Sequence, residues 1–169
     1  MVIPLMKQAE DEPGADERAP LRCGTVWAEG ATCAVEARRA LQAFLAHVPR
    51  TGRPPVPAPL AIDAELVVSE LVTNAIRHAP GPCGMILVLS GRGLAITVWD
   101  TSGELPVVRQ RDGRRFGGHG MHVVHAVSAD VTVAPLGEGK QITAHLRPDE
   151  GAADAGPGAG PVTDVGPAA

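Results

Sequence analysis

Three polar side chains between residues 70 and 78 recur at a spacing that places them on one face of a helix. Glu70, Asn74 and His78 are four residues apart, and each step of four advances only about 40° around a helix axis. Together they place an acid, an amide and a base on one face. Taken alone, the pattern is also typical of a solvated helix face.

A second candidate is the carboxylate of Asp100, which ends the apolar stretch 94–99. A carboxylate at the end of a buried strand, beside a turn, can accept a hydrogen bond from an exocyclic amine such as that of adenine. Aspartate also commonly begins a turn. By itself the residue does not separate a ligand contact from a turn.

The third candidate is a glycine run before a short predicted helix. Gly117, Gly118 and Gly120 precede the apolar segment that starts at Met121. Glycine lets the backbone approach a ligand closely, and a helix start presents unpaired N–H groups to an anion such as phosphate. Flexible loops share this composition, so the run indicates phosphate binding only together with the other candidates.

Three short motifs follow one another in the sequence: Glu70-x-x-x-Asn74, Asp100-x-Ser102 and Gly118-x-Gly120. In this order they resemble the nucleotide-binding boxes of the GHKL superfamily. Bacterial histidine kinases, DNA gyrase and heat-shock chaperone ATPases belong to that superfamily. The stretch 70–79, with Trp99-Asp-Thr-Ser102 and Pro106, is similar to the compact bacterial anti-sigma-factor serine/threonine kinases and their actinobacterial relatives. The resemblance covers about residues 23–146.

The resemblance implies a role for each matching residue. Glu70 would be the general base that takes a proton from a substrate serine, and Asn74 would be a ligand of the Mg²⁺ bound with ATP. Asp100 would read the adenine amine. The other implied ATP-binding residues are Arg77, His78, Ser102, Gly118, His119, Gly120, Met121 and Gln141. A nucleotide lid is implied over 107–115, where the arginines at 109, 111, 114 and 115 would reach phosphate or a partner, or would simply be surface residues.

Some positions depart from the family pattern. His119 stands where an arginine often lies between the glycines. Gln141 is assigned to the position of a threonine near the adenine, and Thr143 replaces an aromatic residue two positions on. These changes put affinity and turnover in question. His119, His122 and His125 step around a helix without a carboxylate beside them, so no zinc site is expected.

The hydrophobic pattern predicts the elements that would position these residues. We expect a strand at 23–28, helices at 32–48, 61–79 and 121–127, a hairpin of 85–90 with 94–100, and strands at 130–134 and 141–146. This order predicts an α+β two-layer sandwich with a mixed, mostly antiparallel sheet and helices on one face, and the family's version is the Bergerat-type ATP-binding fold. The apolar arc of the second helix is predicted to hold Val68, Leu71, Val72, Ala75, Ile76 and Ala79.

Composition limits the remaining possibilities. The net charge of −4 and the 2% aromatic content, without a basic stripe, argue against nucleic-acid binding. No apolar run approaches the roughly 20 residues that cross a bilayer, so a cytoplasmic protein is expected. Residues 1–20 and 148–169 have the composition of disordered tails, the first acidic and the second rich in Gly, Ala and Pro, around a domain at 21–147.

The leading hypothesis is an ATP-dependent protein serine/threonine kinase that regulates transcription by phosphorylating or sequestering a partner. By the family likeness, that partner would be a sigma factor or an anti-sigma antagonist, and a homodimer is possible. The alternative is a non-catalytic ATP-sensing regulatory protein. A sensor histidine kinase would need a helical hairpin before residue 60, where only one helix is predicted, and gyrase- or chaperone-type ATPases carry further domains.

Overall fold

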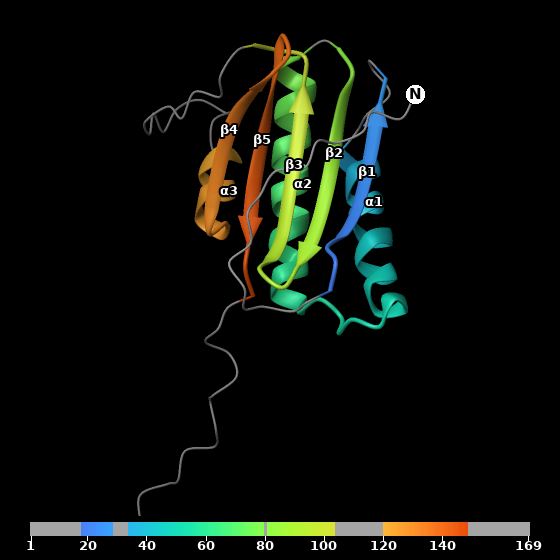
Figure 1. The fold of residues 1–169 in the computed structure, drawn as a ribbon. Coiled ribbons are helices and arrows are strands. Elements are labelled where there is room, and N and C mark those ends of the chain that lie inside the picture. The colour runs from blue at the N-terminus through green and yellow to red at the C-terminus, as the bar shows by residue number, and fades with distance from the viewer. Residues whose placement is uncertain (1–17, 29–33, 80, 104–119, 149–169) are drawn as a thin grey trace, which may run out of the picture.

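In the computed structural model, which describes residues 18–28, 34–79, 81–103 and 120–148, five strands form one sheet covered on one face by three α-helices (Figure 1). The strands are β1 (Leu21–Trp27), β2 (Cys83–Ser90), β3 (Gly93–Asp100), β4 (Asp130–Leu136) and β5 (Gly139–Leu146). The helices are α1 (Ala34–His47), α2 (Ala58–His78) and α3 (Gly120–Val127), and a short 3-10 turn, η1 (Val48–Thr51), follows α1.

The sheet has the strand order β1-β2-β3-β5-β4, and each of these four pairings is antiparallel. Two tight hairpins, β2-β3 and β4-β5, build most of it, and the second turns through Gly137 at φ 61°. The predicted α+β two-layer sandwich is therefore confirmed. The pairing is purely antiparallel among the described strands, where the sequence predicted a mixed, mostly antiparallel sheet.

The core lies between the sheet and α2, and the period-two pattern of the strands selects its residues. In β3, Leu94, Ile96 and Val98 are buried, and α2 contributes its own buried stripe, which consists of Leu60, Ala64, Val67, Val68, Leu71, Val72 and Ala75. Since side chains alternate along a strand, the same buried row of β3 continues to Asp100. The equivalent row of β5, which is Ile142, Ala144 and Leu146, begins with Lys140.

Helix α2 begins three residues earlier than the sequence predicted. The predicted helix begins at 61, but α2 starts at Ala58 and holds Pro59 in its first turn. The first backbone N–H groups of a helix have no partner within it, so a proline there costs no hydrogen bond. The helix ends at His78, because Ala79 takes an extended conformation ahead of Pro80.

One residue of the predicted apolar arc does not belong to it. Ile76 is 45% exposed, whereas Ala75 and Ala79 are buried. Ile76 lies about 100° around the axis from Ala75, and it shares the outer side of α2 with Ile62 and Leu66, which are also exposed. The buried stripe is therefore narrower than the sequence suggested.

Several sequence-based predictions fall on residues outside the described ranges. These include most of the two predicted tails and the first two residues of the helix predicted at 32–48. Within the described ranges, no helix is long and apolar enough to span a membrane.

Candidate functional site

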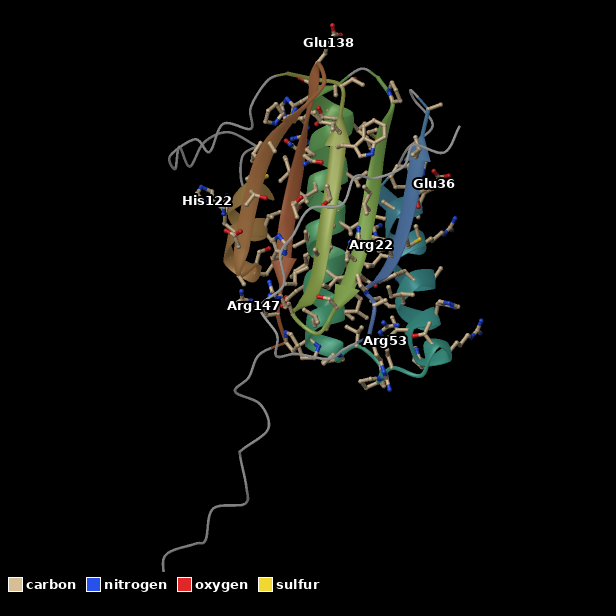
Figure 2. The ribbon with its side chains drawn as sticks, viewed as in Figure 1. Arg22, Glu36, Arg53, His122, Glu138 and Arg147 are labelled. Carbon is tan, nitrogen blue, oxygen red and sulfur yellow. The ribbon has the colours of Figure 1, made fainter. Side chains whose placement is uncertain are left out.

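The candidate residues come from element ends that gather at one end of the sandwich. Helix α2 ends where β3 ends and β5 begins (Figure 1), and α2 packs against both β3 and α3. Figure 2 shows Glu138, at the tip of the β4-β5 turn, at this end of the molecule, and Arg53 and Arg147 at the opposite end. The antiparallel arrangement thus brings together segments that are distant in the sequence.

The start of α3 lies directly against the carboxylate of Glu70. A Cβ atom added to Gly120 would overlap Glu70 Oε2 and would lie 3.0 Å from Cδ. Only glycine fits at this position without moving the acid. The contact joins two candidates that are separate in the sequence, the acid of α2 and the glycine run before α3. Gly118 and His119 of that run lie outside the described residues.

Two polar side chains of α2, one turn apart, are the candidates for ligand contact. Glu70 and Asn74 are half-buried, and within the described part of the chain neither side chain has a hydrogen-bond or ion-pair partner. Two half-buried polar side chains one turn apart, without a partner among the described residues, are available to a ligand. Arg77 and His78 follow in the last turn and are exposed.

The end of α2 and the end of β3 are in contact through their following loops. A Cβ atom on Gly81, just after α2, would overlap Thr101 Oγ1. Thr101 follows Asp100 directly, so the loop after the helix lies against the loop after the strand. This contact places the polar ends of α2 and β3 in neighbouring positions.

Asp100 is buried, and its Oδ1 atom accepts two hydrogen bonds. The Ser102 backbone N–H donates one at 2.9 Å, and the Lys140 ammonium donates the other at 2.9 Å. Lys140 also donates to the Ser102 carbonyl at 3.1 Å. Asp100 is 4% exposed and Lys140 is 2% exposed, so this is a buried ion pair. It holds the carboxylate and the following turn in one arrangement.

The strand register places Lys140, and not Gln141, beside Asp100. Asp100 pairs with Lys140, and Gln141 pairs with Trp99. Because neighbouring residues of a strand point to opposite faces, Gln141 lies on the face of the sheet that is opposite to Asp100. Lys140, which was not among the candidates predicted from the sequence, occupies the position beside the carboxylate. Its signal was its place in the period-two row with Ile142 and Ala144.

The remaining predictions for the site concern the start of α3 and the lid. Met121 is half-buried and packs against the core. The predicted lid at 107–115, with its four arginines, lies outside the described ranges. His122 is exposed, and Figure 2 shows it pointing away from the sheet and from α2.

The donor set suits a nucleotide-bound magnesium ion better than a protein-only metal site. Among the described residues, no group of three or more His, Cys, Asp or Glu side chains could hold a metal ion. Magnesium with a nucleotide takes most of its oxygens from phosphates and water and needs only one or two from the protein. The amide of Asn74, half-buried and without a partner in the part of the chain that the structure describes, fits that requirement.

Comparisons with known proteins agree with this architecture. The sequence matches the family described as the histidine kinase-like ATPase domain over residues 27–146. The fold is similar to a Mycobacterium tuberculosis crystal structure, that of the RsbU and RsbW domains of Rv1364c, with a TM-score of 0.50, 19% sequence identity and 77% of this chain covered. This chain covers 33% of that one, so the likeness concerns the fold alone. No curated protein sequence matches significantly.

Proposed function

Since the chain belongs to the histidine kinase-like ATPase domain family, which the match over residues 27–146 shows, we propose that it is an ATP-binding serine/threonine kinase of the anti-sigma-factor type. ATP binding is the common property of that family. The finer assignment rests on the resemblance of the stretch 70–79 and of Trp99-Asp-Thr-Ser102 to these kinases.

One observation carries the proposal: the carboxylate of Glu70, which has no partner within the described ranges, lies against Gly120 at the start of α3. A helix start favours phosphate, because its N–H groups are unpaired and its dipole is positive there. An acid beside such a site is positioned to accept a proton from a hydroxyl that approaches the phosphate. Glu70 is therefore the proposed general base.

The other residues divide the task of binding. Asn74, one turn beyond Glu70, would hold the Mg²⁺ that neutralises phosphate charge, and Asp100 would hold the base of the nucleotide. Ser102 supports Asp100 through its backbone N–H. Arg77 and His78 would add positive charge at the same end, and Gly118 and His119 belong to the proposed phosphate loop.

The proposed partner is a sigma factor or an anti-sigma antagonist that presents a serine or threonine. This part of the proposal rests on the sequence resemblance to anti-sigma-factor kinases. Because the proposed reaction uses ATP, we also propose a cytoplasmic location. We also propose that the chain can form a homodimer, again from its likeness to these kinases.

Glu70→Gln tests the proposed chemistry. The amide cannot accept the substrate proton, so phosphate transfer from radiolabelled ATP should fall by about 10²- to 10⁴-fold, while the affinity for Mg-ATP, measured by isothermal titration, stays nearly unchanged. Glu65→Gln is the matched control. Glu65 lies on the same helix, but its carboxylate accepts a hydrogen bond from Gln42 of α1, so this variant should transfer phosphate normally.

Asn74→Ala, in the same titration, should weaken Mg-ATP binding by about tenfold or more, since a hydrogen bond or ligand to a charged group contributes about 1.5–3 kcal/mol. A fully active Glu70→Gln protein would contradict the role of Glu70. Unchanged Mg-ATP binding by Asn74→Ala would contradict the role of Asn74.

A second candidate function is an ATP-sensing protein that sequesters its partner without transferring phosphate. Gln141 stands where the family pattern has a threonine, and this change puts turnover in question. His119 also departs from the family pattern. Partner binding that depends on ATP, with no label transferred, would support the sensor over the kinase.

A further inference from the structure

The buried pair of Asp100 and Lys140 changes what the base-binding position can recognise. Lys140 Nζ lies 2.9 Å from Asp100 Oδ1 and 3.1 Å from the Ser102 carbonyl oxygen. The ammonium has three N–H donors, and a carboxylate has about four acceptor positions on its two oxygens. These contacts occupy two of the three donors and one of the two oxygens. The pair can therefore present both a donor and an acceptor to a ligand.

A lone buried carboxylate would be selective for adenine. The carboxylate accepts a hydrogen bond from the exocyclic amine at position 6 of adenine. In a 6-oxopurine that position carries an oxygen, which is also an acceptor, so no hydrogen bond forms. A site built to hydrogen-bond one group strongly rejects an analogue that leaves its buried polar groups unpaired. That selectivity depends on the carboxylate acting without a donor beside it, and in this chain Lys140 supplies a donor.

Both purine edges are complementary to a donor next to an acceptor. Adenine presents the amine, a donor, beside N1, an acceptor. Hypoxanthine presents O6, an acceptor, beside N1–H, a donor. An ammonium next to a carboxylate satisfies either arrangement, with the two partners exchanged. The geometry at Asp100 therefore does not discriminate at position 6 as a lone carboxylate would.

We propose that Lys140 is a specificity-determining residue, and that it makes this nucleotide site accept 6-oxopurine triphosphates as well as ATP. The inference rests on the proposed function, in that it assumes the base binds at Asp100. Lys140 acts through the ammonium on Asp100 Oδ1, and not through the phosphates. It should therefore affect the preference between bases more than the affinity for the triphosphate.

The test compares Mg-ATP with Mg-ITP, whose bases differ only at position 6 and N1, by isothermal titration. The wild-type protein should bind the two within about fivefold of each other. Lys140→Met keeps the length of the side chain and removes the ammonium, so the preference for ATP should rise at least about tenfold, the effect of one unmatched polar contact. Lys7→Met, at the other lysine of the chain, should leave the ratio at the wild-type value.

Three results would overturn the inference. One is a wild-type preference for ATP above about thirtyfold, which decides the question even if Lys140→Met does not fold. The second is a folded Lys140→Met protein, checked by circular dichroism, that has the wild-type ratio. The third is a wild-type protein that binds neither nucleotide, which would contradict the proposed function as well. Binding of ATP with strong rejection of ITP would overturn this inference alone.

Discussion

At the scale of residues, the site depends on two close contacts between segments that are far apart in the sequence. Gly120 leaves no space between the start of α3 and the carboxylate of Glu70. Lys140 and the Ser102 N–H both donate to Asp100 Oδ1. The first contact combines an acid with a helix start, and the second fixes the carboxylate that would meet the base. Proton transfer would depend on the first contact and base selection on the second.

Gly120→Ala should separate the catalytic position of Glu70 from protein stability. The new methyl group would overlap Glu70 Oε2, which is the far end of a flexible side chain, so the acid can move away at little cost. Gly120 is the first residue of α3, so the preference of helix interiors for alanine over glycine has little effect there. The thermal midpoint should therefore change little, while phosphate transfer falls at least about tenfold as the general base is displaced.

Gly24→Ala is the control for this substitution. Its Cβ atom would meet only the Met85 carbonyl oxygen, at an ordinary 3.9 Å, so transfer should keep its wild-type rate. Stability assays and label transfer on both variants make the comparison. Normal transfer by Gly120→Ala would mean that the position of the Glu70 carboxylate does not matter for the reaction.

The sequence predicted the shared helix face of Glu70 and Asn74, but not the residue that lies beside Asp100. Spacing alone put Glu70 and Asn74 on one helix face, because a helix repeat is regular. The partner of Asp100 was harder, because it depends on the register between β3 and β5, and a shift of one residue reverses every face. The register places Lys140, which was not among the candidates, beside Asp100, whereas Gln141 was predicted from the family resemblance. The row of Lys140, Ile142 and Ala144 was the available signal.

At the scale of elements, α2 is the part on which both the core and the site depend. Its buried stripe packs on the sheet, and its polar side carries Glu70 and Asn74 to α3 and to the end of β3. The sequence predicted this helix and its C-terminal end well, since Pro80-Gly81-Pro82 stops it. The predicted start of the helix was three residues too late, because a proline is tolerated in the first turn of a helix. Ile76 is exposed because of the way α2 packs on the sheet, which the hydrophobic pattern alone does not show.

Leu71→Ala and Leu66→Ala compare the two sides of α2. Leu71 is 1% exposed and lies in the core, whereas Leu66 is 43% exposed. Removing the Leu71 side chain should lower the free energy of unfolding by about 2–5 kcal/mol, because a cavity remains among close-packed neighbours. The same change at Leu66 should cost less than about 1 kcal/mol. Equal losses in urea unfolding would contradict the orientation of α2.

At the scale of the whole molecule, antiparallel pairing and one helical layer bring the ends of α2 and β3 and the start of β5 to the same end of the sandwich. The fold class could be predicted because the order of helical and strand patterns is compatible with few packed arrangements. The acidic tail 1–20, the tail 148–169 and the lid at 107–115 remain predictions from composition and resemblance. The match to the histidine kinase-like ATPase domain covers residues 27–146.

The central claim is that three segments, α2 near Glu70 and Asn74, the end of β3 near Asp100, and the start of α3 at Gly120, form one nucleotide site. A titration of isotope-labelled protein with Mg-ATP, followed through its backbone amide NMR signals, tests this most directly. We predict that signals of all three segments shift together with one dissociation constant, while those near Arg53 and Arg147 at the opposite end stay fixed. Shifts confined to one segment, or found mainly at the opposite end, would contradict it.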